Sequence, residues 1–277
     1  MKFTKMQGIG NDYIYVNGFE ERVGDPAKLA VRLSDRHFGV GSDGLILIEP
    51  SEIADCRMDM YNADGSRSGM CGNGIRCVAK YVYERGIARR DVLTVETLSG
   101  VKTLSLETAG GKVKSVEVDM GEPVLDPAKI PVRFPKGPVV AQPLAVGGKE
   151  YRVTCVSVGN PHCVLFVDDV LRAPVETAGP QFERHPVFPE HVNAEFVQVI
   201  GRDELRMRVW ERGSGETLAC GTGACASAVA AALNGKTGRS VRVRLRGGDL
   251  SIRWDETSGH VFMKGPAEFV FDGSVEI

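Results

Sequence analysis

The feature that most constrains this chain is an internal duplication. Cys71 begins the segment CGNG, and Cys220 begins CGTG at an offset of 149 positions, the difference between 220 and 71. The same offset places residues 57–61 (RMDMY) on residues 206–210 (RMRVW), and residues 10–11 (GN) on residues 159–160 (GN). A repeat that keeps one offset over two motifs predicts two similar domains. The alternative is a chance similarity of two strand–turn–helix units.

Each copy is predicted to contain short strands around one apolar helix. The apolar residues that follow each cysteine predict helices that end at Gly86 and Gly235. Residues 223–233 are almost entirely Ala, Val, Cys, Ser and Leu, and a helix that is hydrophobic on every side is buried on every side. The predicted fold class is α/β (α+β), with two pseudo-symmetric domains. Each domain would be a mostly antiparallel, β-barrel-like sheet wrapped around a central apolar helix.

The domain boundary is expected in the Pro- and Gly-rich stretch 119–143. We predict an N-terminal domain of residues 1–120 plus 266–277, and a C-terminal domain of residues 121–265. The last predicted strand, residues 267–271, could complete either domain, and we favour its return to the first.

Composition and charge exclude several classes of protein. The net charge of −2 gives no reason to expect a nucleic-acid partner, and the alternating arginines of residues 241–246 (VRVRLR) are typical of a half-buried strand. No apolar run approaches the roughly 18 residues of a membrane helix. The N-terminus lacks a secretory signal, so a cytoplasmic location is expected, with the seven cysteines reduced. No Cys-x-x-Cys motif is present, and we predict no metal site.

The two matched cysteines indicate acid–base chemistry. Unpaired N–H groups and the helix dipole favour an anion at a helix N-terminus, so we expect the pKa values of Cys71 and Cys220 to lie below the ordinary value. A carboxylate held by the same N–H groups is the other possibility. Two opposed thiols suit a proton exchange at one carbon, where one removes a proton and the other delivers one to the opposite face. Such a reaction requires no cofactor, and we predict none.

Polar residues of both copies are expected to meet in a cleft between the domains, where small molecules commonly bind. They are Asn11, Asn62, Asn73, Asn160, Asn193, Glu211, Arg212 and Thr222. For His162, a structural role and a site role both remain open. The other five cysteines lie in apolar patterns that indicate core packing, namely Cys56, Cys77, Cys155, Cys163 and Cys225.

On these motifs the chain resembles the diaminopimelate epimerase family over its full length. The motifs are residues 8–12 (GIGND), 62–76 (NADGSRSGMCGNGIR), 159–162 (GNPH) and 211–225 (ERGSGETLACGTGAC). The resemblance implies a cofactor-independent isomerase that interconverts LL-2,6-diaminopimelate and meso-diaminopimelate in lysine and peptidoglycan biosynthesis. It also implies a homodimer. From the charge and the apolar runs described above, we expect no nucleic-acid or membrane partner.

The resemblance further assigns roles to residues. The candidate catalytic residues are Cys71 and Cys220, as the acid–base pair, together with His162 and Glu211. The distal carboxylate and amine of the substrate would be held by Asn11, Asn62, Asn160, Asn193 and Arg212, with Glu211 on the amine. The reacting carboxylate would be held by Gly72, Asn73, Gly221 and Thr222. Some family members carry Gln where this chain has Gly44, so a side-chain contact there is lost.

Two alternative functions remain open. The proline racemase and hydroxyproline epimerase group also uses a pair of cysteines. Two features argue against this group: Asn73 in the first motif, and polar residues suited to bind the second ammonium and carboxylate groups of a longer substrate. A non-catalytic or thiol-redox protein could use the same cysteines.

Overall fold

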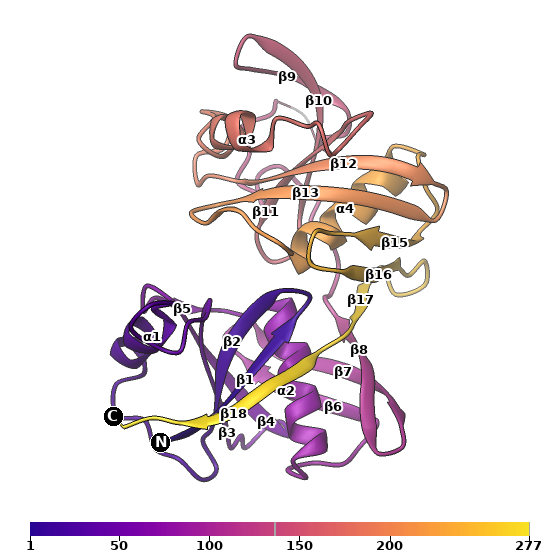
Figure 1. Cartoon of the computed structure of the whole chain (residues 1–277). Coiled ribbons are helices and arrows are strands. Elements are labelled where there is room, and N and C mark those ends of the chain that lie inside the picture. Colours follow the sequence, from indigo (N-terminus) through magenta and orange to yellow (C-terminus); the bar gives the residue numbers. More distant parts are fainter. Residues whose placement is uncertain (136, 277) are drawn as a thin grey trace. The chain divides into compact units, whose positions relative to one another are not determined.

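The computed structural model describes residues 1–135 and 137–276, which divide into two compact units. The first unit contains residues 1–119 and 264–277, and the second contains residues 120–263. The C-terminal strand β18 (Glu268–Ser274), drawn in yellow in Figure 1, pairs antiparallel with β1 (Lys2–Gly8) and so belongs to the first unit. The sequence analysis favoured this return of the last strand to the first domain.

The sheet of the first unit combines antiparallel and parallel neighbours. Strand β1 pairs antiparallel with β2 (Asn11–Asn17), β2 parallel with β3 (Gly44–Glu49), and β3 antiparallel with β4 (Cys56–Asn62). Strand β4 pairs antiparallel with β5 (Arg67–Ser68) and parallel with β6 (Val92–Thr97). The sheet continues antiparallel through β7 (Gly100–Ala109) and β8 (Lys112–Asp119).

The second unit repeats this pattern of pairing. Its strands are β9 (Gln142–Val146), β10 (Lys149–Ser157), β11 (Pro161–Phe166), β12 (Asn193–Gly201), β13 (Glu204–Glu211), β14 (Gly215–Glu216), β15 (Ser240–Arg244) and β16 (Asp249–Trp254). Strands β10 to β16 pair with the same sequence of directions as β1 to β7, including the two parallel pairings, β11 with β12 and β13 with β15. The duplication read from the sequence is therefore a duplication of topology. Strand β17 (Val261–Gly265) contains the division between the units.

Each unit is built around one buried helix. In the first unit, residues 72–82 of α2 (Gly72–Glu84) are all buried, and in the second, residues 223–231 of α4 (Gly221–Leu233) are buried. Helix α4 packs against strands β10 to β13, β15 and β16 of its own unit, because a surface of Ala, Val and Cys allows close contact on every side. The predicted α+β class and the wrapped apolar helices are confirmed.

Two further helices cover the sheets. Helix α1 (Pro26–Ser34) packs on β3 through its buried Leu29 and Leu33, and α3 (Val175–Glu183) packs on β12 and β13. Among the described residues no helix is long and apolar enough to cross a membrane. The five cysteines expected in the core are all buried there.

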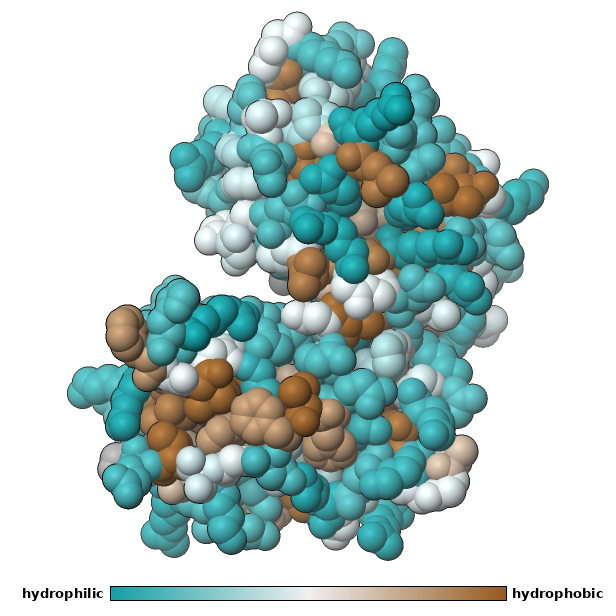
Figure 2. Space-filling model, viewed as in Figure 1, coloured by the Kyte–Doolittle hydropathy of each residue, from teal (hydrophilic) through white to brown (hydrophobic). Residues whose placement is uncertain are grey.

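One surface of the first unit carries exposed hydrophobic side chains. Figure 2 shows apolar residues gathered over the region of β1 and β18, and Val270 and Phe271 of β18 are both about half exposed. Phe271 contacts Phe3 of β1 edge to face.

Candidate active site

Both predicted catalytic cysteines cap the N-termini of the central helices. Cys71 has extended backbone angles (φ −122°, ψ 121°), and its Sγ accepts a hydrogen bond of 3.3 Å from the N–H of Gly74 in α2. Cys220 has φ −125° and ψ 109°, and its Sγ accepts a 3.4 Å hydrogen bond from the N–H of Gly223 in α4. The same cap has thus formed twice, as the two CG-x-G motifs predict.

The glycines of these caps are required for close packing. A Cβ atom at Gly74 would lie 2.8 Å from Cδ1 of Ile46, and one at Gly223 would lie 2.9 Å from Oε1 of Glu195. A side chain at either position would require Ile46 or Glu195, or the first helical turn that carries the thiol, to move.

In the first unit, the structure brings Cys71 and Asn11 together. The Cys71 thiol donates to Oδ1 of Asn11 at 3.1 Å, and Asn11 begins β2 directly after Gly10, whose φ is +89°. Tyr13, two residues along β2, is buried beside them. Burial raises its pKa well above the ordinary value, and the neighbouring Cys71 and Asp43 raise it further. The sequence interpretation included Asn11 and missed Tyr13.

The other predicted residues of this unit lie on the cysteine loop and its neighbouring strand. Asn62 ends β4, and its Nδ2 donates to Oγ of Ser66 at 3.0 Å. Asn73 is buried, and its Oδ1 accepts a 2.9 Å hydrogen bond from Nη2 of Arg76. Arg76 also donates to the carbonyl oxygen of Gly72 at 3.0 Å. The buried guanidinium group of Arg76 therefore braces the first turn of α2.

The environment of Cys220 differs from the sequence-based expectation. Burial raises the pKa of its thiol well above the ordinary value, and the carboxyl groups of Glu211 and Glu195 add to the effect. Hydrogen bonds from Thr222 and the Gly223 N–H act in the opposite direction but are outweighed. The prediction that the helix terminus lowers this pKa is therefore wrong, because desolvation and two nearby carboxyl groups exceed the helix-terminus effect.

Glu211 is the acidic partner of Cys220. It ends β13, hydrogen-bonds the Cys220 thiol and accepts a hydrogen bond from the hydroxyl group of Thr217. Burial raises the pKa of Glu211, so its carboxyl group holds a proton more readily than an exposed glutamate does. Thr222 also contacts the thiol, with its Oγ1 3.6 Å from Sγ of Cys220.

His162 is fixed from both sides in the interior of the second unit. Its Nδ1 lies 2.7 Å from Oε1 of Glu195, and its Nε2 lies 2.8 Å from Oδ1 of Asn160. The side chains of His162 and Glu195 are fully buried. Glu195, in β12, was missed by the sequence interpretation, although a carboxylate between the apolar residues Ala194 and Phe196 of a strand is a usable signal.

Asn193 and Arg212 lie together at the ends of β12 and β13. Asn193 is buried, with its Nδ2 donating to the carbonyl oxygen of Pro161 at 2.8 Å and its Oδ1 accepting from the N–H of Arg212 at 3.0 Å. Arg212 itself is exposed, and its Nη1 donates to the carbonyl oxygen of Glu190 at 3.0 Å. Asn193 thus ties β11 to the segment that presents the Arg212 guanidinium group.

Within each unit, therefore, predicted residues cluster around the capping cysteine. Asn11 contacts Cys71 in the first unit, and Glu211 and Thr222 contact Cys220 in the second. Among the described residues, no group of three His, Cys, Asp or Glu side chains is arranged to hold a metal ion.

Comparison with known sequences adds an independent finding. The sequence model of the diaminopimelate epimerase family matches residues 3–125 and 154–270. A diaminopimelate epimerase of Acetivibrio thermocellus is 58% identical over 277 residues, covering 100% of this chain and 99% of the relative. One of Desulfovibrio desulfuricans is 56% identical over 288 residues, covering 100% of this chain and 99% of the relative.

Comparison with solved structures shows the fold. A PhzF-family phenazine biosynthesis protein of Bacillus anthracis superposes with a TM-score of 0.73 at 15% identity, covering 100% of this chain and 99% of the other. A probable proline racemase of Agrobacterium radiobacter gives a TM-score of 0.69 at 15% identity, with coverage of 100% and 93%. A hydroxyproline epimerase of Agrobacterium vitis gives 0.68 at 16% identity, with coverage of 99% and 90%.

Proposed function

The chain belongs to the diaminopimelate epimerase family, and on that premise we propose that it interconverts LL-2,6-diaminopimelate and meso-diaminopimelate with Cys71 and Cys220 as the two acid–base groups. The observation that carries the residue assignment is the matched pair of capping thiols. Each accepts a hydrogen bond from the third residue of its helix, and each has a polar partner at the sulfur, Asn11 in one unit and Glu211 in the other.

The chemistry follows from the properties of the two thiols. One cysteine, as thiolate, removes the α-proton, and the other, as thiol, delivers a proton to the opposite face of the same carbon. Removing this proton builds negative charge on the adjoining carboxylate. The backbone N–H groups of Gly72, Asn73, Gly221 and Thr222 at the two helix N-termini are suited to receive that charge. No step requires a metal ion or an organic cofactor.

Glu211 gives the second half of the site a way to form a thiolate. Its carboxyl group is hydrogen-bonded to the Cys220 thiol, and the pKa values of both groups are raised. Transfer of the thiol proton to Glu211 replaces one buried negative charge by another, so it avoids the cost of creating a new one. We also propose His162 as a candidate catalytic residue, and its Nε2 is hydrogen-bonded to Oδ1 of Asn160.

The distal carboxylate and ammonium groups of the substrate would be bound by residues of opposite charge. A guanidinium group is suited to a carboxylate and a carboxylate to an ammonium group, which supports Arg212 and Glu211 in these roles. The asparagines at positions 11, 62, 160 and 193 supply neutral donors and acceptors. The finer expectations, a cytoplasmic location and a homodimer, remain predictions. The exposed apolar side chains of Val270 and Phe271 support the latter.

The runner-up activity is racemisation of proline or hydroxyproline. The structural likeness to such enzymes is at 15–16% identity and speaks for the fold alone. Proline has one carboxylate and no second ammonium and carboxylate pair, so it would leave Glu211 and Arg212 without a substrate group to bind, which disfavours this alternative.

Incubation with LL-diaminopimelate in deuterated water tests the proposal. We expect the meso isomer to form with solvent deuterium at the inverted α carbon, and we expect Cys71→Ser and Cys220→Ser to lose this turnover. Turnover of proline in place of diaminopimelate would overturn the substrate assignment. Thiol–disulfide exchange by the parent protein, without epimerisation, would favour a redox role.

A further inference from the structure

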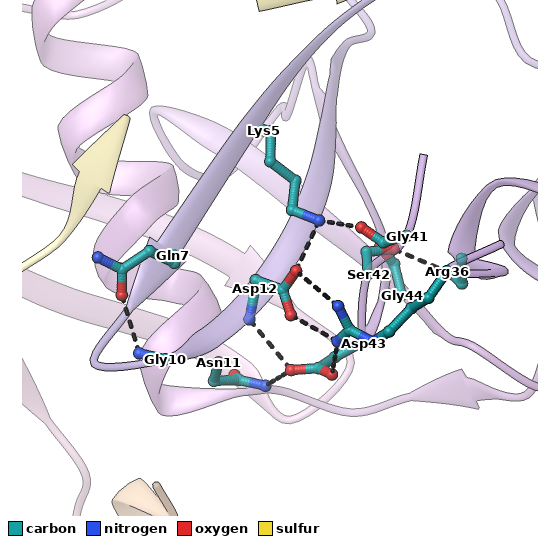
Figure 3. Close-up of polar contacts among 11 residues, drawn as sticks. Lys5, Gln7, Gly10, Asn11, Asp12, Arg36, Gly41, Ser42, Asp43 and Gly44 are labelled. Carbon is teal, nitrogen blue, oxygen red and sulfur yellow. Dashed lines mark hydrogen bonds and ion pairs between the residues drawn. The ribbon is translucent and has the colours of Figure 1, made fainter. Parts of the chain in front are cut away.

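A network of charged side chains lies beside Asn11, and none of its members belongs to the predicted site (Figure 3). Nζ of Lys5 lies 2.6 Å from Oδ2 of Asp12, and Nη2 of Arg36 lies 2.9 Å from Oδ1 of Asp12. The same Nη2 lies 2.9 Å from Oδ1 of Asp43, so Arg36 joins the two aspartates. Lys5 also donates to the carbonyl oxygen of Gly41.

Asp43 is held in place by its backbone as well as by this network. Its N–H donates to the carbonyl oxygen of Asp12 at 2.7 Å, and its own carbonyl oxygen accepts from the N–H of Ala63 at 3.1 Å. The residue therefore connects the start of β2 to the turn that follows β4. Its carboxylate is anchored on the Oδ1 side by Arg36 and presents Oδ2 to β2.

Oδ2 of Asp43 accepts two hydrogen bonds. One comes from the N–H of Asp12 at 3.0 Å, and the other comes from Nδ2 of Asn11 at 2.7 Å. Burial raises the pKa of Asp43 from its ordinary value, while the hydrogen bonds from the N–H of Asp12 and from Asn11, and the charge of Arg36, favour the ionised form. An ionised carboxylate only accepts hydrogen bonds, so the end of the Asn11 amide that faces it is the NH₂ group. The other end of the amide, Oδ1, then faces the Cys71 thiol, which donates to it at 3.1 Å.

We propose that Asp43 is a positioning residue for the epimerase reaction, which orients the Asn11 amide so that an oxygen, and not an NH₂ group, meets the sulfur of Cys71. The inference rests on the proposed role of Cys71. An acceptor at the sulfur stabilises the thiol, which is the proton-delivering form, whereas the N–H of Gly74 stabilises the thiolate. Asp43 acts on this balance through Asn11, without touching the reacting atoms.

The groups around Cys71 allow the effect to be isolated. Tyr13 of β2 hydrogen-bonds both Asn11 and Cys71, and Tyr15 of β2 and Cys77 of α2 interact electrostatically with Cys71. Burial raises the pKa values of all three, that of Cys77 to about 11. These groups stay neutral near pH 7. Asp12 provides a matched control, because its carboxylate belongs to the same network but contacts Arg36 and Lys5, whereas the direct hydrogen bonds between Asp12 and Asp43 use the backbone N–H and carbonyl oxygen of Asp12.

The experiment compares Asp43→Asn with Asp12→Asn in the full chain. An amide at position 43 no longer fixes which end of Asn11 faces the sulfur. We expect Asp43→Asn to lower kcat for LL-diaminopimelate about 10-fold and to shift the pH midpoint for alkylation of Cys71 by iodoacetamide downward by about 0.5–1 unit, resolved by peptide mass spectrometry. Asp12→Asn should change kcat less than about 3-fold and leave the midpoint in place.

A double-mutant cycle distinguishes positioning from a general loss of stability. In the Asn11→Ala background, Asp43→Asn should produce no further shift in Cys71 alkylation, because the residue through which it acts is gone. Circular dichroism at the assay temperature checks folding, and Asp43→Ser replaces Asp43→Asn if the latter is unfolded.

Three results would overturn the proposal: equal losses of kcat in the two aspartate variants, an unchanged Cys71 midpoint in Asp43→Asn, or a full shift that persists without Asn11. A parent protein inactive on LL-diaminopimelate would refute the proposed function instead. The alkylation measurements need no turnover, so they would still decide whether Asp43 orients Asn11.

Discussion

The thiol of Cys220 and the carboxyl group of Glu211 are hydrogen-bonded to each other in the interior of the second unit, and the pKa of each is raised. This relationship makes the two groups a proton-sharing pair. In the proposed reaction, Glu211 is therefore the group that takes the proton of the Cys220 thiol, and while Glu211 is ionised its charge opposes ionisation of that thiol.

The first prediction is that Glu211→Gln makes Cys220 more acidic while reducing epimerase activity. Removing the carboxylate removes a charge that opposes ionisation of the thiol, so the pKa of Cys220 falls. We expect alkylation of Cys220 at pH 8 to become about 10-fold faster, equivalent to about one pKa unit. Glu150→Gln, on the exposed part of β10, is the control. Slower or unchanged alkylation in Glu211→Gln would contradict the assigned pairing.

The second prediction concerns acid stability of the second unit. Arg208 hydrogen-bonds Glu216 at 2.7 and 2.8 Å and lowers the pKa of this nearly buried carboxyl group. A lowered folded-state pKa stabilises the protein above the unfolded value, and the stabilisation is lost as the pH falls through the folded value. We therefore expect Glu216→Gln to cost about 1–3 kcal/mol in unfolding free energy at pH 7 and less at pH 3.5.

Urea titrations at the two pH values measure this difference. Asp169→Asn breaks an exposed pair with Arg172 and should change little at either pH. An equal loss for Glu216→Gln at pH 7 and pH 3.5 would show that the ion pair is not the source of the stabilisation.

The third prediction is that the backbone of this chain leaves no room for a side chain at Gly44, the position where some family members carry Gln. A Cβ atom there would lie 2.1 Å from the carbonyl oxygen of Tyr61 and 2.9 Å from Cε1 of Tyr13. The backbone of β3 would have to move away from β4, so we expect Gly44→Ala to lower the free energy of unfolding by about 2–4 kcal/mol. Gly24→Ala is the control, because Gly24 has no neighbouring atom within 4 Å and no positive φ. A similar stability for both variants would contradict the close approach.

The features that the sequence predicted correctly are those that occur in both copies of the internal repeat. Cys71 and Cys220 both cap the start of a helix, as expected from the Gly-x-Gly motif that follows each cysteine at the offset of 149. The apolar residues of α4 predicted that this helix is buried. The same offset places Tyr13 on His162, and the structure buries both beside an asparagine.

The parts that the sequence did not predict depend on pairings between distant strands. Asp43 falls on Val192 under the offset, so the repeat gives no sign of its role, and its contacts with Asn11 exist only because the backbone of residue 43 pairs with Asp12. The raised pKa of Cys220 depends on how deeply the thiol is buried and on Glu195 in β12, neither of which a motif reports. Local motifs therefore predicted that the two cysteines cap helices, whereas the pKa of the Cys220 thiol depends on the tertiary structure around it.

The last prediction concerns Arg212 and the choice of substrate. Arg212 is exposed and its guanidinium group donates to the carbonyl oxygen of Glu190, so it contributes little to packing. Arg212→Met should therefore change the free energy of unfolding by less than about 0.5 kcal/mol. If Arg212 holds the distal carboxylate of diaminopimelate, the variant should lose kcat/KM by about 100- to 1000-fold, or roughly 3–4 kcal/mol. Arg172→Met, at another exposed arginine, is the control.

Lysine and proline lack the second pair of ammonium and carboxylate groups that diaminopimelate carries, so both should be poor substrates of the parent protein. If the parent racemises proline as readily as diaminopimelate, or if Arg212→Met keeps full activity, the substrate assignment fails while the two-cysteine chemistry can still hold.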